Sequence, residues 1–139
     1  MLKKDFHFFD VAKAVSKIDR EFPKNRYKIG AIITDKNKII SVGYNQQKTN
    51  PIQKKYNKFR PYIVYNPYIH AEIHAILNSK KDSLKGCSIY TYRETKDGKI
   101  SNSRPCEACM ELIKKMGIKK ICYTTKDGYC IEYIKEEDT

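Results

Sequence analysis

A pair of cysteines in the segment SRPCEACMELIKKMG, residues 103–117, restricts the fold more than any other feature of the sequence. Cys106 and Cys109 lie three positions apart at the start of a helical pattern, so both sulfurs can point from one face of the first turn and bind one ion. Free N–H groups and the positive end of the helix dipole lower the pKa of a thiol there and favour the thiolate that a metal requires. Two thiolates do not complete a zinc site, so the fold must bring a further ligand to this helix start.

The three histidines are the nearest further ligands along the chain. His7 lies beside two phenylalanines in the first turn of a predicted helix, and we expect it to be a surface or packing residue. His70 precedes Glu72 by two positions in YIHAEIHAILNS, and both side chains can face one site only if His70 stands at the helix entrance with non-helical geometry. His74 lies one turn further in, where we expect it to pack or to hydrogen-bond within the core.

A structural zinc clip is the alternative interpretation of the cysteine pair. Glu72 would then be a capping carboxylate without a part in chemistry. The fourth ligand would come from one of four residues, His74, Cys87, Cys122 or Cys130. The three cysteines of this set occupy predicted strands, where we expect them to be small buried residues.

Hydrophobic periodicity predicts three helices. The first has Asp5 as its cap and stops before Pro23, while the second and third cover residues 70–79 and 106–116. Gly117 is placed as the C-terminal cap of the third helix. The apolar stripe of the first helix consists of Phe8, Val11, Val15, Ile18 and Phe22.

Runs rich in β-branched and aromatic residues predict strands at five places, residues 29–34, 39–44, 87–92, 118–125 and 128–134. The polar turn DKNK joins the first two strands into a hairpin, and KDG joins the last two into a closing antiparallel hairpin. The order of helices and strands implies one sheet covered by helices, a layered α/β sandwich. At this length we expect one domain, residues 1–139.

Several features favour a cytoplasmic protein without membrane contact. The chain carries five cysteines at scattered spacings, and no apolar run approaches the ~18 residues that a membrane span needs. Asp5, His7 and Asp10 interrupt the only segment that could serve as a secretion signal. We therefore expect reduced thiols.

The formal net charge of +12 invites a phosphate-bearing partner, although an A/T-rich genome would produce the same excess of lysine whatever the function. Part of this charge lies in the polar segment 46–68, which has no clear period and is expected to be a loop. The segment has no acidic residue and mixes five basic residues, Lys48, Lys54, Lys55, Lys58 and Arg60, with five aromatic residues, Tyr56, Phe59, Tyr62, Tyr65 and Tyr68. Such a mixture can follow a phosphate backbone and stack bases, but it equally fits a lid packed on its own domain or a site for one nucleotide phosphate.

Two motifs carry a resemblance to a known group of enzymes. HAE at 70–72 and PCEAC at 105–109 match the H-x-E…P-C-x-x-C signature of the zinc-dependent cytidine deaminase-like superfamily. Each half alone is weak, but the two together, each at a predicted helix start, form a strong signal. The run GAIITDKNKIISVGYN is similar to the first hairpin of nucleotide deaminases, and its GYN is common in deoxycytidylate deaminases. The resemblance implies a three-layer α/β/α fold around a mixed five-stranded sheet.

The resemblance also implies a catalytic metal site. His70, Cys106 and Cys109 would hold one Zn²⁺, with the fourth position open for a water molecule. Glu72 would take the proton of that water, pass it to the ring nitrogen of the base and help to expel ammonia.

Three further residues receive substrate-binding roles from the same resemblance. The backbone N–H of Ala71 would hold the ring carbonyl of the base, and the carbonyl of Pro105 would receive the exocyclic amine. Asn45 would contact the base or the sugar. Asn45 alternatively turns the chain at the end of a strand.

The closing hairpin departs from the deoxycytidylate and tRNA adenosine deaminase patterns, which place a helix between the last two strands. It looks more like the free cytidine and blasticidin type, whose metal sites begin with cysteine rather than histidine. The leading hypothesis is a deaminase that converts cytosine to uracil in a small nucleotide or nucleoside and resembles deoxycytidylate deaminases. The second is a deaminase that edits cytosine or adenine in single-stranded DNA or RNA, and the third is a non-catalytic, zinc-stapled nucleic-acid-binding module. Many relatives in the resembled superfamily form homo-oligomers, so the resemblance is also compatible with a homo-oligomer.

Overall fold

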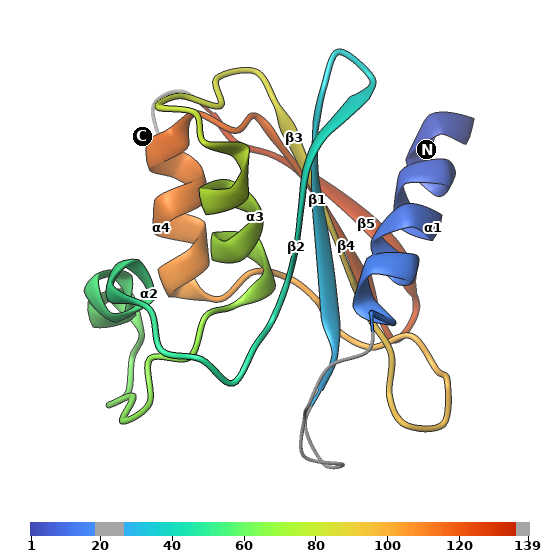
Figure 1. The fold of residues 1–139 in the computed structure, drawn as a ribbon. Coiled ribbons are helices and arrows are strands. Elements are labelled where there is room, and N and C mark those ends of the chain that lie inside the picture. The colour runs from blue at the N-terminus through green and yellow to red at the C-terminus, as the bar shows by residue number, and fades with distance from the viewer. Residues whose placement is uncertain (19–26, 136–139) are drawn as a thin grey trace.

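The computed structural model describes residues 1–18 and 27–135. Within these residues, α-helices, strands and one short 3₁₀-helix, η1, follow one another along the chain (Figure 1). In chain order the elements are α1 Lys3–Ser16, β1 Ile29–Asp35, β2 Lys38–Tyr44, α2 Pro51–Tyr56, η1 Asn57–Phe59, α3 Ala71–Ser79, β3 Ser88–Arg93, α4 Glu107–Met116, β4 Lys120–Thr125 and β5 Gly128–Tyr133.

The strands form one mixed five-stranded sheet in the order β2-β1-β3-β4-β5. The pair β3 and β4 is parallel, and the other neighbouring pairs are antiparallel. Lys36 and Asn37 both have positive φ in the turn between β1 and β2, as a tight two-residue hairpin requires. The antiparallel pairing of β4 with β5 confirms the predicted closing hairpin.

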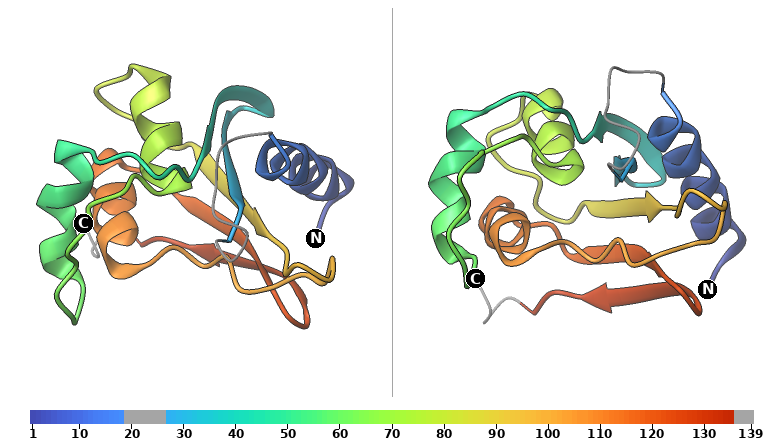
Figure 2. Two further views of the ribbon diagram at one scale, coloured as in Figure 1. Left: turned by 60° about the horizontal axis from the view of Figure 1, so that its bottom comes forward. Right: turned by 90° about the horizontal axis from the view of Figure 1, so that it is seen from below.

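Helices cover both faces of this sheet, which gives three layers (Figure 2). α1 lies on one face, while α3 and α4 lie on the other with α2 outside them (Figure 1). Side chains alternate along the strands accordingly: Ile33 of β1 and Ile89 of β3 belong to the core under α3 and α4, whereas Ile32 and Tyr90 belong to the core under α1. The predicted three-layer α/β/α fold is confirmed.

The first helix is shorter than its periodicity predicts. α1 ends at Ser16, so Ile18 lies beyond the helix and remains 38% exposed, and the predicted Phe22 lies outside the described residues. Asp5 does not occupy the cap position. It lies in the first turn, and its carboxylate accepts a hydrogen bond from the N–H of Leu2, while Tyr90 of β3 donates another over 2.5 Å.

The segment 46–68 is not wholly a loop, because it contains α2 and η1. Asn50 caps α2 by accepting hydrogen bonds from the N–H groups of Ile52 and Gln53, and Pro51 occupies the first helical position. Both choices stabilise a helix start. The remainder of the segment forms extended chain that returns to α3, joined to the outgoing chain by a bridge between Thr49 and Tyr68.

One glycine allows α3 to reach the sheet. A Cβ at Gly43 of β2 would collide with the backbone of α3 at Ala71 and Ala75. The close approach is held by Ser41, whose hydroxyl donates to the carbonyl of Ala75, and by Asn78, whose amide donates to the carbonyl of Val42. The start of α3 is therefore fixed against the end of β2.

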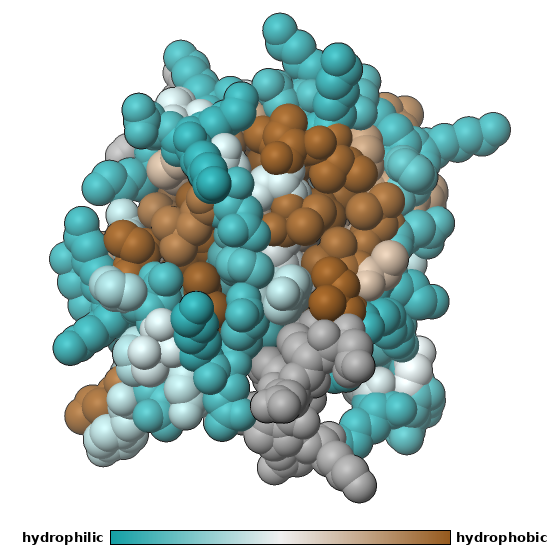
Figure 3. All heavy atoms as spheres, viewed as in Figure 1, coloured by the Kyte–Doolittle hydropathy of each residue, from teal (hydrophilic) through white to brown (hydrophobic). Residues whose placement is uncertain are grey.

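β2 is an edge strand whose Ile39 and Val42 remain partly exposed. Hydrophobic atoms gather on the surface between β2 and α1, whereas hydrophilic atoms dominate the periphery (Figure 3). Among the described residues, none of the helices has the length and apolar character needed to cross a membrane.

Candidate metal and active site

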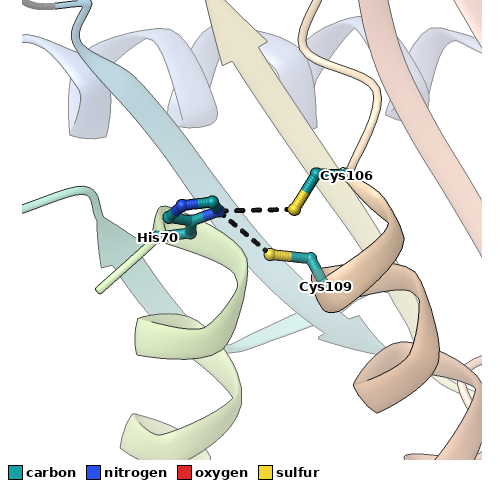
Figure 4. Close-up of side chains that lie close together, drawn as sticks. All are labelled: His70, Cys106 and Cys109. Atoms are coloured by element: carbon teal, nitrogen blue, oxygen red, sulfur yellow. Dashed lines mark hydrogen bonds between the residues drawn. The ribbon is translucent and has the colours of Figure 1, made fainter. Parts of the chain in front are cut away.

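His70 meets the cysteine pair, which is 36 and 39 positions away in sequence, where α3 and α4 begin (Figure 4). The Nδ1 atom of His70 lies 3.5 Å from the Sγ atom of Cys106 and 3.4 Å from the Sγ atom of Cys109. All the potential ligand atoms lie within 4.8 Å of one another. Two sulfurs and one imidazole nitrogen at this spacing match the donor set of a zinc site, so these residues fit the implied metal.

The local backbone explains why these side chains converge. His70 is the N-cap of α3 with extended geometry, φ −84° and ψ 157°, which is the non-helical entrance that its spacing from Glu72 requires. Cys106 is the N-cap of α4, with φ −70° and ψ 171°, and Cys109 lies one turn further on. Pro105 precedes the cap, where its fixed φ limits the directions from which the chain can enter the helix. Because α3 and α4 lie side by side on one face of the sheet, their starts face each other (Figures 1 and 4).

Gln53 positions His70 through a hydrogen bond to its backbone, and the sequence did not point to Gln53 as a site residue. It is fully buried in α2, and its Oε1 atom accepts a hydrogen bond of 3.0 Å from the backbone N–H of His70. Its Nε2 atom donates over 2.8 Å to the Oδ1 atom of Asn57. A glutamine in a segment taken for a loop gives no metal-site signal. The Asn50-Pro51 helix start would have been the one clue that Gln53 lies on an ordered element.

Ser103 plays a comparable part for the cysteines and was also missed. Its buried hydroxyl donates to the carbonyl of Thr91 in β3 and accepts a 2.8 Å hydrogen bond from the N–H of Thr124 in β4. The Thr91 hydroxyl in turn donates to the carbonyl of Ser103 over 2.8 Å. These bonds attach the chain that leads into Cys106 to two neighbouring strands. No short sequence pattern links three residues so far apart.

Glu72 lies in the first turn of α3 and is 5% exposed. Burial raises the pKa of its carboxyl to about 7, although the nearby His70 opposes the shift. A carboxyl group that titrates near neutral pH can both accept and return a proton under physiological conditions. A proton shuttle needs a carboxyl group of this kind, whereas a carboxylate that only caps a helix does not need a raised pKa.

The pKa values of the two thiols are shifted in opposite directions. A hydrogen bond from Cys109 lowers the pKa of Cys106 to about 3, with a further contribution from His70. The same hydrogen bond, together with burial, raises the pKa of Cys109. Burial alone would lower the pKa of His70, but its bond to Cys106 and the charge of Glu72 outweigh that effect and raise it. The cluster therefore holds protons that a metal ion would displace.

The other predicted ligands lie elsewhere. His74 accepts a 3.0 Å hydrogen bond at Nδ1 from the backbone N–H of Tyr44, consistent with the expected packing role. His7 is exposed on α1. Cys87 and Cys122 are buried as predicted, whereas Cys130 is only half-buried. Within the described ranges, none of these residues joins the metal cluster, so they do not supply the fourth ligand of a structural clip.

Two of the predicted substrate-binding residues adjoin the cluster. Ala71 is buried at the first position of α3, where a helix leaves the N–H group without an internal acceptor. Pro105 is buried directly before the Cys106 cap.

Asn45 has a clear local function. Its side chain accepts a 2.9 Å hydrogen bond from the N–H of Ile29 and donates to the carbonyl of Tyr27, which fixes the chain entering β1. Asn45 also lines a cavity of about 520 Å³ that His70 borders. The structural interpretation of Asn45 is therefore supported, and its position beside the cavity leaves contact with a substrate open to test.

The fold and this donor set define a class of three-layer α/β/α proteins with a His-Cys-Cys cluster suited to zinc. The chain belongs to the family described as "Cytidine and deoxycytidylate deaminase zinc-binding region", whose model matches residues 2–125.

Relatives with curated names agree with this family. The chain is 31% identical to a probable deoxycytidylate deaminase of Drosophila melanogaster over 133 residues, covering 87% of this chain and 61% of the relative. It is 30% identical to human deoxycytidylate deaminase over 110 residues, covering 68% of this chain and 51% of the human protein. The chain thus spans only part of the length of these relatives.

Solved structures agree with the fold. The deoxycytidylate deaminase of cyanophage S-TIM5, solved with dCMP and dUMP, superposes with a TM-score of 0.61 at 22% identity, covering 90% of this chain and 84% of that chain. The cytidine deaminase of Burkholderia pseudomallei gives a TM-score of 0.64 at 17% identity, covering 96% and 93%. At these identities the likeness establishes the fold alone.

Proposed function

We propose that residues 1–139 act as one zinc-dependent hydrolytic deaminase domain that converts the cytosine base of a small nucleotide or nucleoside to uracil with release of ammonia. One observation carries this proposal: the buried Glu72 carboxyl in the first turn of α3 adjoins a cluster of one histidine and two cysteines. A purely structural zinc clip has no need of such an acid. Family membership and the names of the relatives support the same reaction class.

The metal would be Zn²⁺ held by His70, Cys106 and Cys109. When bound, zinc makes a water molecule acidic enough to supply hydroxide at neutral pH. Glu72 would take a proton from the attacking water, deliver it to the ring nitrogen and then help the amine to leave as ammonia. Burial of Glu72 keeps this proton exchange away from bulk solvent.

Neighbouring groups orient the base. The N–H of Ala71 binds the ring carbonyl, and the carbonyl of Pro105 accepts from the exocyclic amine. Both residues flank the metal ligands in sequence, which keeps their backbone groups near the reacting carbon. Asn45, which lines the cavity, contacts the base or the sugar while it fixes the chain at Ile29.

A second function is favoured by the exposed aromatic residues at the cavity. Tyr62 and Tyr65 are 56% and 86% exposed and line its wall, where bases of single-stranded DNA or RNA would stack. Tyr56, a stacking candidate from the sequence, is buried in the core and is not available. We place editing of single-stranded nucleic acid second because Arg60 is the one permanently charged side chain in the described lining of the cavity, and a polymer backbone would need several.

Glu72→Gln tests the chemistry. The variant keeps the shape of the side chain but cannot shuttle a proton, so we expect retention of zinc and a loss of deamination of at least about 10²-fold. The measurement is ammonia release from cytidine, deoxycytidine, their monophosphates and single-stranded oligonucleotides. Glu107→Gln, at the exposed first position of α4, is the matched control and should keep full activity. A Glu72→Gln protein as active as the control would show that the proton acceptor is another group.

A further inference from the structure

The cavity beside His70 has an uneven distribution of charge. Its lining consists of tyrosine, aliphatic and amide side chains, with no acidic residue among those described. Among the lining residues that the structure describes, Arg60 is the one that carries a permanent charge. A single permanent cation in an otherwise neutral hollow marks the place where an anionic group of a ligand would be most stable.

The guanidinium of Arg60 is only partly satisfied within the described structure. It stacks on the ring of Tyr62, 4.6 Å from the ring centroid, and one of its terminal nitrogens donates to the Tyr62 hydroxyl. Its Nε atom is buried and makes no hydrogen bond to a described residue, and no described carboxylate pairs with this arginine. A buried charged donor without an acceptor is costly, so an acceptor supplied by a ligand would be favourable.

Arg60 also lies close to the metal cluster. It lines the same cavity as His70, one of the three members of that cluster. The lysines of the same segment do not share this position. Lys55 is exposed on α2. Lys54 and Lys58 line an adjoining shallow hollow, which also includes Arg60 but not His70.

We propose that Arg60 binds the phosphate group of a nucleoside monophosphate substrate and thereby makes the enzyme select the nucleotide over the free nucleoside. The planar fork of an arginine matches a phosphate, to which it can donate two parallel hydrogen bonds. Stacking on the ring of Tyr62 orients the guanidinium before the substrate arrives. This inference rests on the proposed deaminase function, and it narrows the phosphate contact expected of the basic segment 46–68 to Arg60.

Substrate selection by three variants provides the test. For Arg60→Gln we expect kcat/KM for dCMP to fall about 10- to 100-fold, while kcat/KM for deoxycytidine changes less than about twofold. Arg60→Lys, which keeps the charge without the fork, should lie between the wild type and Arg60→Gln. Lys55→Gln removes the same charge from the neighbouring helix and should leave both substrates unaffected. Equal losses for nucleotide and nucleoside, or no loss for the nucleotide, would overturn the proposal.

Product binding separates this inference from the proposed reaction. Calorimetric titration with dUMP and with deoxyuridine needs no turnover, and in the zinc-loaded wild type dUMP should bind at least about tenfold more tightly. Arg60→Gln should abolish that difference, and a preference that survives in a folded Arg60→Gln protein would refute the role of Arg60. If the wild type deaminates no cytosine compound yet shows the Arg60-dependent preference for dUMP, the proposed function fails while the phosphate site stands. Tm measurements verify that each variant is folded.

Discussion

Replacement of Gln53 by leucine should weaken zinc binding without removing any metal ligand. The side chain is fully buried, and its carbonyl oxygen accepts the backbone N–H of His70 at 3.0 Å. Leucine has a similar volume but offers no acceptor, so the His70 N–H becomes a buried donor without a partner. That loss costs about 1–3 kcal/mol in the free energy of unfolding. Because outer-shell contacts of metal ligands typically contribute 10- to 100-fold to metal affinity, we expect a loss of zinc affinity of that order.

Asn57→Ala is the matched control for this prediction. Gln53 also donates to Asn57 over 2.8 Å, and both variants lose that bond, but only Gln53→Leu loses the bond to His70. Asn57 is half-buried, so water can replace part of its lost partner and the control should cost about 1 kcal/mol or less.

Zinc affinity is measured by competition with a chromophoric chelator, and stability by urea unfolding of the metal-free proteins. Cobalt substitution adds a direct view, because the visible absorption of Co²⁺ responds to the position of the imidazole ligand. We expect altered cobalt bands and weaker zinc binding in Gln53→Leu, with near wild-type behaviour in Asn57→Ala. Equal zinc affinities in the two variants would refute the view that Gln53 positions His70, even if both were destabilised.

The remaining predictions concern the metal ligands and a buried carboxylate on the opposite face of the sheet. Purified protein should hold about one zinc per chain by elemental analysis, and Cys106→Ala or Cys109→Ala should lose it, whereas zinc retained by both variants would contradict the assignment. Burial opposes ionisation of Asp5, but hydrogen bonds from Tyr90, Lys120 and a backbone N–H outweigh it and lower the pKa of Asp5 below its ordinary 3.8. The stabilisation is therefore present above about pH 4 and lost as the pH falls through the lower pKa of the folded state. Asp5→Asn should cost about 1–3 kcal/mol at pH 7, with a deficit that shrinks in acid, as urea unfolding across this range would show, and a deficit independent of pH would contradict this account.

Local signals predicted most of the elements that carry the metal site. His70 stands at a helix entrance and the cysteine pair at another, as spacing and the flanking prolines indicated. The two hairpin turns and the Gly117 cap were also predicted, because each depends on a few adjacent residues. These features are encoded within one or two turns of chain, which is the range that periodicity and cap residues report.

Contacts between distant segments were not predictable in the same way. Asp5 is separated from Tyr90 by 85 positions and from Lys120 by 115. The residues next to Asp5 in the sequence do not show whether its carboxylate caps a helix or belongs to a buried ion pair. α2 was missed because six residues are too few for a helical period to emerge. Gln53 and Ser103, which position the site, could not be predicted for the same reason. Each acts through a polar contact that forms only in the assembled fold.

The closing hairpin bears less on substrate choice than its departure from the family pattern suggested. The described lining of the cavity comes from the chain before and within β1, from residues 45–47 and from residues 60–70, and includes no residue of β4 or β5. β5 instead reaches the site indirectly, because Glu132 pairs with Arg104 at 2.7 Å, two positions before Cys106. That ion pair is partly exposed and helps to hold the chain that leads into α4 without contacting the cavity. The described lining of the cavity does not depend on how the last two strands are joined, and we expect discrimination among substrates to depend on the segment that carries Arg60.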